Sequence, residues 1–277
     1  MIGIQRTSEG GLRVDVRFSR PLLYLDSGAI GSLAATDEQA GVALREALLG
    51  KDGTLLFSWI HVLELVQIAP GPRYRRVREY LEGFGQNFTL IEGDPYRLLK
   101  LGVQPDLAPN DAKRLVDHQF LNTCLTPEDP ERPPTLGTVL DQSEEERHAD
   151  PDSLSKVLQS FKVNQANTLS AALATLEAHG IRLRPQRPTA YGPAESRHPR
   201  HTLDTIMLEM AREHEKYTPS DAADVCHAAV GATYADFCLL DNKWAARIRE
   251  RVPVENRAAT FEWRSRRELI AGIASYV

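Results

Sequence analysis

Near its N-terminus the chain reads Leu22-Leu23-Tyr24-Leu25-Asp26-Ser27-Gly28-Ala29-Ile30. A short apolar run that ends in a carboxylate, a hydroxyl and a glycine, with a helix-like segment behind it, is typical of a buried parallel strand that feeds a helix. Asp26 then lies just past the carboxyl end of that strand, at the edge where open α/β sheets bind ligands. An equally good interpretation of this stretch alone is that Asp26 or Ser27 only caps the next helix.

Other segments follow the same design. Thr54 to Phe57 is a second buried-strand candidate, and Ser58 is placed to cap a helix in which Glu64 is the only charged residue. Such an acid is costly to bury unless a positive group meets it, although an exposed helix glutamate explains it as well. Further strands are expected at Thr89 to Ile91, at Phe237 to Leu240 before Asp241, and at Val252 to Val254 as the edge strand.

The strand-and-helix pattern is interrupted in the middle of the chain. Residues 2–18 alternate apolar and polar side chains, which predicts a β-hairpin ahead of the main fold. The pattern therefore predicts an α/β core interrupted by a helical insertion. Its expected parts are an N-terminal hairpin over 1–20, a core over 21–91 and 202–256, a mostly helical insertion over 92–201 and a closing helix over 257–277.

Composition restricts the class of protein. The 277 residues are 42% hydrophobic, which suffices for a packed core, and the formal charge of −5 excludes a uniformly basic nucleic-acid binder. The cysteines Cys124, Cys226 and Cys238 show no paired spacing, which suits a reducing compartment and gives no zinc pattern. No signal peptide or membrane span is evident, so a cytoplasmic protein is expected.

Four acids are expected to meet at one edge of the sheet. In a parallel sheet the strand ends and the starts of the following helices share one rim, which would gather Asp26, Glu64, Asp224 and Asp241. Their repulsion would raise their pKa values, and a divalent cation would relieve it; oxygen ligands favour Mg²⁺ or Mn²⁺. Asp221 precedes Asp224 by three residues on one helix face, so either can be the third acid.

These segments resemble the PIN-domain (PIN-like) nuclease family over residues 21–91 and 202–256. The matching segments are Tyr24-Leu25-Asp26-Ser27, Ser58 through Glu64-Leu65, Asp224 through His227-Ala228-Ala229, and Ala235 through Asp241. The resemblance implies a three-layer α/β/α sandwich with a central parallel sheet, and metal-dependent hydrolysis of phosphodiester bonds, usually in RNA. Leu240 stands where the family often has Thr or Ser, and the insertion is unlike the compact toxin ribonucleases of the family.

The resemblance suggests a two-metal-ion ribonuclease. Asp26, Glu64 and Asp224 would hold one ion and Asp241 would complete a second site, so that the pair activates a water and stabilises the leaving oxygen. Ser27 could orient a carboxylate or a water, with Asp221 and Asp236 as weaker supporting candidates. For His227, a core or supporting role is favoured over that of a base.

Basic side chains suggest where a nucleic acid would lie. Arg73, Arg75, Arg76 and Arg78, with Tyr74 among them, could contact phosphates and stack on a base of single-stranded or structured RNA. A solvated helix face explains them equally well. A second candidate patch is formed by Arg197, His198, Arg200 and His201.

Other functions remain open. A PIN-like scaffold without catalysis could bind nucleic acid or a protein partner through its insertion, and PIN-like domains often pair as homodimers. A phosphatase of the haloacid dehalogenase type needs a second Asp where Gly28 stands. A histidine-metal hydrolase is weaker still, because His118 and His148 have no matching partners.

Overall fold

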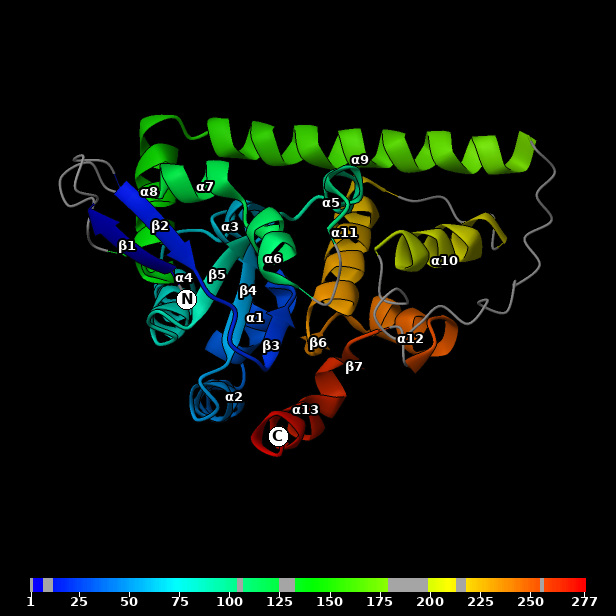
Figure 1. The fold of residues 1–277 in the computed structure, drawn as a ribbon. Coiled ribbons are helices and arrows are strands. Elements are labelled where there is room, and N and C mark those ends of the chain that lie inside the picture. The colour runs from blue at the N-terminus through cyan, green and yellow to red at the C-terminus, as the bar shows by residue number, and fades with distance from the viewer. Residues whose placement is uncertain are drawn as a thin grey trace.

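A computed structural model describes residues 2–6, 12–103, 107–124, 133–178, 199–212, 218–254 and 257–277. Within these residues the main sheet has five strands in the order β5-β4-β3-β6-β7, and every neighbouring pair is parallel (Figure 1). The central strand β3 is the apolar run of the opening stretch. The strands are β3 (Leu22–Leu25), β4 (Thr54–Ser58), β5 (Phe88–Ile91), β6 (Phe237–Leu239) and β7 (Ala259–Phe261).

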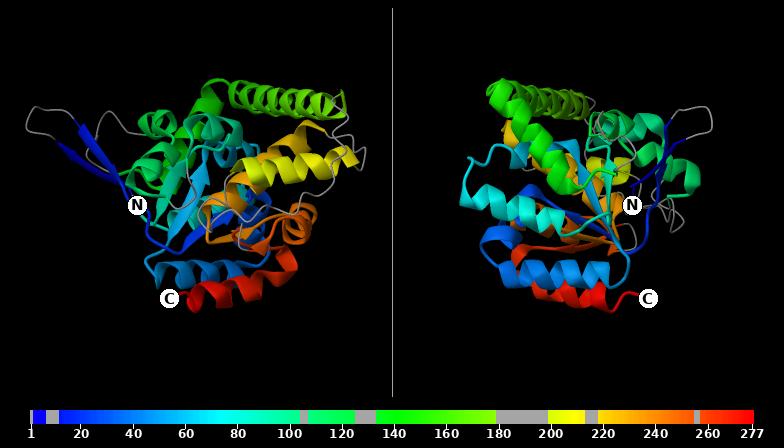
Figure 2. Two further views of the ribbon diagram at one scale, coloured as in Figure 1. Left: turned by 45° about the vertical axis from the view of Figure 1, so that its right-hand side comes forward. Right: turned by 90° about the vertical axis from the view of Figure 1, so that its left-hand side faces the viewer.

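Helices cover both faces of this sheet because successive strand side chains point to opposite sides. Leu23 and Leu25 belong to one buried core, whereas Leu22 and Tyr24 belong to the other. The α/β class with a central parallel sheet is therefore confirmed, and the arrangement is consistent with three layers. The first core includes α1 (Ser27–Ala35), α2 (Glu38–Leu49), α4 (Pro72–Glu82) and α13 (Arg266–Ala274), and the second includes α10 (Pro199–Arg212), α11 (Pro219–Tyr234) and α12 (Asn242–Arg251). Figure 2 shows α2 and α13 side by side on their face.

Helix α11 packs closely against the central strand. Its small residues allow this approach, and the side chains from Val225 to Tyr234 are all buried. A Cβ on Gly231 would stand only 2.7 Å from the Tyr24 ring, so glycine is needed at this contact. The contact fixes α11 against β3 and thereby sets the position of Asp224 and His227, which lie earlier on the same helix.

The described residues of the segment 92–201 are mostly helical, as predicted, and its longest helix, α9, crosses α3 and α11 (Figure 1). The N-terminal hairpin is also confirmed, as an antiparallel pair that forms a separate two-stranded sheet. The hairpin consists of β1 (Ile2–Arg6) and β2 (Leu12–Val16), and α3 (Trp59–Leu65) follows β4. The helices of the segment 92–201 include α5 (Pro95–Leu101), α6 (Pro109–Leu115), α7 (His118–Thr123), α8 (Leu136–Ala149) and α9 (Ser153–Ala178).

The prediction of an edge strand at Val252 to Val254 was wrong. Val252 is the C-cap of α12, and Val254 is 71% exposed, so the apolar Val252-Pro253-Val254 run joins no sheet. The edge strand is instead β7, which pairs with β6. The segment 257–277, expected to be helical throughout, therefore begins with a strand. The backbone of Val252 is already bonded elsewhere, because its N–H donates to the Ile248 carbonyl oxygen of α12 and its carbonyl oxygen accepts from Arg257 Nε.

Candidate active site

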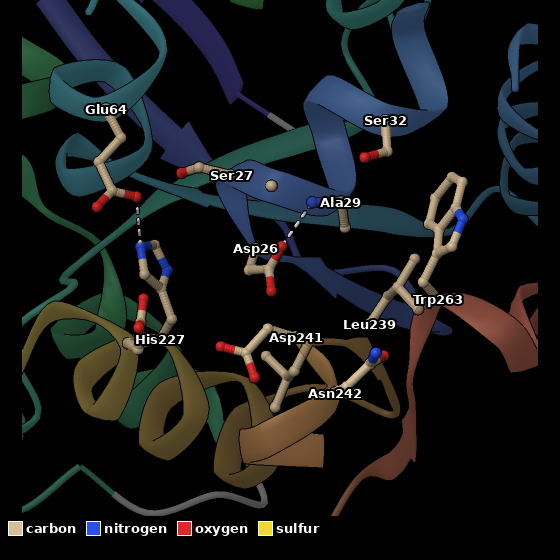
Figure 3. Close-up of a pocket in the computed structure, with 13 residues that line it drawn as sticks. Asp26, Ser27, Ala29, Ser32, Glu64, His227, Leu239, Asp241, Asn242 and Trp263 are labelled. Atoms are coloured by element: carbon tan, nitrogen blue, oxygen red, sulfur yellow. Dashed lines mark hydrogen bonds and ion pairs between the residues drawn. The ribbon is translucent and has the colours of Figure 1, made fainter. Parts of the chain in front are cut away.

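A pocket of about 340 Å³ opens where β3 and β6 end (Figure 3). Residues from the following helices line it together with residues from α3 and α11. The structure therefore brings all four predicted acids to one place, namely Asp26, Glu64, Asp224 and Asp241. Other lining residues include Ser27, Gly28, Ser32, His227, Asn242 and Trp263.

Asp26 and Asp241 are helix caps as well as pocket residues. Asp26 Oδ1 accepts a hydrogen bond from the Ala29 N–H at 2.6 Å, and Asp241 Oδ1 accepts one from the Trp244 N–H at 2.8 Å. Asp26 is thus a helix cap, as one interpretation of the opening stretch expects, but it also lines the pocket at the carboxyl end of β3. The caps fix each carboxylate on its helix, while Figure 3 shows the second oxygen of Asp26 turned toward Asp241.

The acids of this pocket influence one another electrostatically. Burial raises the pKa of Asp26 to about 6, and the negative charge of Asp241 adds to the effect against the opposing influences of the Ala29 N–H and His227. Burial likewise raises the pKa of Asp224 to about 6, followed by the charge of Asp241. The pKa values of Asp26 and Asp224 are therefore raised, as predicted, but burial contributes more to this than the repulsion on which the prediction was based.

Glu64 differs from the other acids because two positive or donating groups meet it. Lys162 Nζ of α9 lies 3.2 Å from Glu64 Oε1, and His227 Nε2 lies 3.2 Å from Oε2. Burial would raise the pKa of Glu64, but the bond from His227 and the charge of Lys162 lower it. The prediction that repulsion raises the pKa of every acid was therefore wrong for Glu64.

Two buried histidines connect the pocket to the sheet. His227 Nδ1 shares a 2.6 Å hydrogen bond with the Tyr24 hydroxyl of β3, so this ring is held between the sheet and Glu64. His61 Nδ1 accepts from the Ser58 N–H at 3.0 Å, and its Nε2 bonds the Leu25 carbonyl oxygen at 2.7 Å. Burial lowers the pKa of His61 to about 3, which keeps the ring neutral. These contacts give both histidines positioning roles.

The supporting residues fall in different places. Ser27 Oγ is buried in the pocket wall and has no hydrogen-bond partner among the described residues. Its hydroxyl is thus available to a ligand in the pocket.

Asp221 and Asp236 do not line the pocket, which corrects their prediction as supporting residues. Asp221 closes a capping box with Thr218 and pairs with Lys243 at 3.0 Å; although burial opposes it, these contacts lower its pKa. Asp236 precedes β6 at the opposite edge of the sheet, where it accepts the Leu22 N–H and pairs with Arg20. The third acid of the pocket is therefore Asp224.

The donor set suits a hard divalent cation. Asp26, Asp224 and Asp241 offer only oxygen atoms, as Mg²⁺ or Mn²⁺ prefers, and all three line one pocket. As the side chains stand, no group of three His, Cys, Asp or Glu residues within the described ranges is arranged to hold a metal ion. Binding here therefore requires these carboxylates to close on the ion.

The arginines of α4 do not act as one surface. Arg78 forms a double hydrogen bond with Asp141, at 2.6 and 2.5 Å, and Arg76 pairs with Glu38 at 3.2 Å. Tyr74 is buried and donates to the Leu140 carbonyl oxygen, so its predicted role in stacking on a base was wrong.

Two of these arginines remain candidates for phosphate contacts. Arg73 and Arg75 are exposed and have no ion-pair partner in the part of the chain that the structure describes. The Arg73 guanidinium lies over α1, with Nη2 3.6 Å from where a Cβ on Gly31 would stand, one turn beyond the pocket-lining Ser27. In the second patch, Arg197 and His198 lie outside the described residues, as do the side chains of Arg200 and His201.

Sequence reasoning missed Lys162 and His61. Lys162 belongs to the insertion and carries no motif, so nothing in the sequence connects it with Glu64. His61 had a usable signal, because it follows Ser58 by three residues, and the two form a reciprocal capping box.

Comparison with protein-family models, curated proteins and solved structures finds no significant match for this chain. Among the described helices, none combines the length and apolar character needed to cross a bilayer.

The raised pKa values predict how stability depends on pH without metal. Each acid titrates near 3.8 when unfolded and about 6 when folded, so between these values the native state holds more protons. Their contribution to stability is full below about pH 4 and is lost as the pH rises through 6. Asp224→Asn should therefore be more stable than the native chain at pH 7, by about 1–2 kcal/mol, and show little gain at pH 4.

Urea unfolding in EDTA between pH 4 and 7.5 measures this difference. Asp221→Asn is the matched control on the same helix, and it should lose stability at pH 7 because its acid has a lowered pKa. A constant difference between Asp224→Asn and the native chain across this range would contradict the account.

Proposed function

We propose that this chain is a metal-dependent nuclease of the PIN-like kind that hydrolyses phosphodiester bonds in RNA. The observation that carries the proposal is the gathering of Asp26, Asp224 and Asp241 in one pocket at the carboxyl ends of β3 and β6. Because these carboxylates repel one another in the pocket, a cationic ligand is favoured there. The sheet edge and the order of the acids along the chain agree with the family that the sequence resembles.

The residues divide into ligands and supports. Asp26, Asp224 and Asp241 would hold Mg²⁺ or Mn²⁺, which when bound supplies positive charge to the phosphoryl oxygens and activates water. Glu64 is fixed by His227, and the unpartnered Ser27 hydroxyl is placed to orient a water or a carboxylate.

Features around the pocket support a nucleic acid as the substrate. Trp263 lines the same pocket, and because the Arg266 guanidinium lies over its ring, 4.6 Å from the centroid, only the other face could stack on a base, the role first expected of Tyr74. Arg73 and Arg75 are exposed cations of the neighbouring helix α4 that form no ion pair with the described residues. Together these side chains would let phosphates and bases approach from solvent.

A PIN-like scaffold that binds nucleic acid or a protein without cleaving is the second candidate. The Lys162 ion pair with Glu64 favours it, because this contact neutralises one of the four acids. The absence of a Thr or Ser hydroxyl at Leu240 points the same way. Cleavage assays decide between the two functions.

Loss of the pocket acids should abolish cleavage. Asp26→Asn and Asp224→Asn each remove a charged ligand, so Mn²⁺-dependent cleavage of labelled RNA should fall by at least about 100-fold, since even indirect supports of metal sites are worth 10–100-fold. Asp221→Asn is the control, because its carboxylate pairs with Lys243 outside the pocket. Undiminished cleavage by Asp224→Asn, or no metal-dependent cleavage by the native chain, would refute the nuclease.

The double variant Arg73→Ala with Arg75→Ala should weaken RNA binding. Each phosphate contact that is lost reduces the slope of log K against log salt by about 0.7 for a single strand. Fluorescence anisotropy in an Asp26→Asn background measures binding without cleavage. Arg78→Gln is the control, because Arg78 is already held by Asp141. If the double variant keeps the slope of the parent, these arginines do not contact phosphates.

A further inference from the structure

A cation of the insertion contacts one of the acids that line the pocket, although it does not line the pocket itself. Lys162 Nζ of α9 lies 3.2 Å from Glu64 Oε1, and the two side chains are only 17% and 18% exposed. The other oxygen of Glu64 meets His227 Nε2. Asp26, Asp224 and Asp241, by contrast, form no ion pair with any residue that the structure describes.

Helix α9 is anchored on both sides of this lysine. The preceding Phe161 packs edge-on against Trp59, with ring centroids 4.7 Å apart, in a small buried cluster with residues of α3 and α11. One turn later, Gln165 Nε2 donates to Asp94 Oδ2 at 3.1 Å. The backbone around Lys162 is therefore fixed, and the ammonium is delivered to Glu64 by packing rather than by a chance surface contact.

We propose that Lys162 is the resident cation of Glu64 at the border of this pocket, and that its ammonium takes the place beside Glu64 that a second divalent ion would occupy. This inference rests on the proposed metal-dependent function and changes its design. Asp26, Asp224 and Asp241 then hold one divalent ion, instead of sharing two ions with Glu64 as the sequence suggested.

Charge balance supports a single ion. Lys162 already compensates the negative charge of Glu64. Only Asp26, Asp224 and Asp241 therefore need a bound cation, and a single divalent ion balances most of their negative charge. A second divalent ion at Glu64 would stand beside the ammonium in a partly buried site, where like charges repel strongly. The insertion thus limits how many ions the pocket takes, which gives it a role within the site.

The number of Mn²⁺ ions bound by the full chain tests this inference. Isothermal titration calorimetry and the electron paramagnetic resonance of free Mn²⁺ should give one ion for the native chain and for Lys162→Arg, which keeps the charge. Lys162→Gln and Lys162→Met should bind two, because Glu64 is released. Lys156→Gln is the matched control on α9, since Lys156 pairs with Asp152 at 3.5 Å in an exposed position, and it should bind one.

Each outcome decides between the inference and the proposed function. Two ions on the native chain, or a single ion on both uncharged variants with their melting curves intact, would overturn the role of Lys162 and leave the nuclease proposal standing. If the uncharged variants fail to fold, the ion count of the native chain and Lys162→Arg still decides. No Mn²⁺ bound by any form would remove the metal site, and this inference with it.

Discussion

The mutual repulsion of carboxylates at one edge of the sheet is the constraint on which the rest of the site depends. Asp26 and Asp241 follow neighbouring parallel strands, so the sheet itself forces them together, and α11 adds Asp224. Helix N-termini stabilise the first two through their free N–H groups. Burial chiefly raises the pKa values of Asp26 and Asp224, and the charge of Asp241 adds to this effect, so a bound cation would stabilise their charged forms.

Core packing keeps the acids at that edge. Tyr24 contacts α11 at Gly231 and bonds His227 on the same helix, so a single strand residue sets both the approach and the rotation of α11. His61 joins the end of β3 to the start of α3, which carries Glu64. These hydrogen bonds therefore continue from the buried sheet into the pocket. Displacing a side chain whose polar atoms are all hydrogen-bonded would cost free energy, because those atoms would lose their partners.

The strands and the pocket acids could be predicted from the sequence where a local pattern of residues exists. Short apolar runs ending in acids located β3 and β6, because burial on both faces leaves a continuous hydrophobic signal. The same logic failed for Val252 to Val254, because this run begins at the C-cap of α12 and the backbone of Val252 is bonded to that helix. The contact of Lys162 with Glu64 could not be predicted from sequence, because it depends on the path of the long helix α9 across the fold. Tyr74 shows the same limit, because only packing reveals that an aromatic among arginines faces the core.

The most direct test of the central claim is a crystal of the native chain soaked in Mn²⁺, examined by anomalous scattering. We expect one peak in the pocket, with oxygens of Asp26, Asp224 and Asp241 closed around it and Lys162 still beside Glu64. A pocket without a peak at saturating Mn²⁺, with these carboxylates unmoved, would contradict the claim that their gathered charge exists to hold a cation.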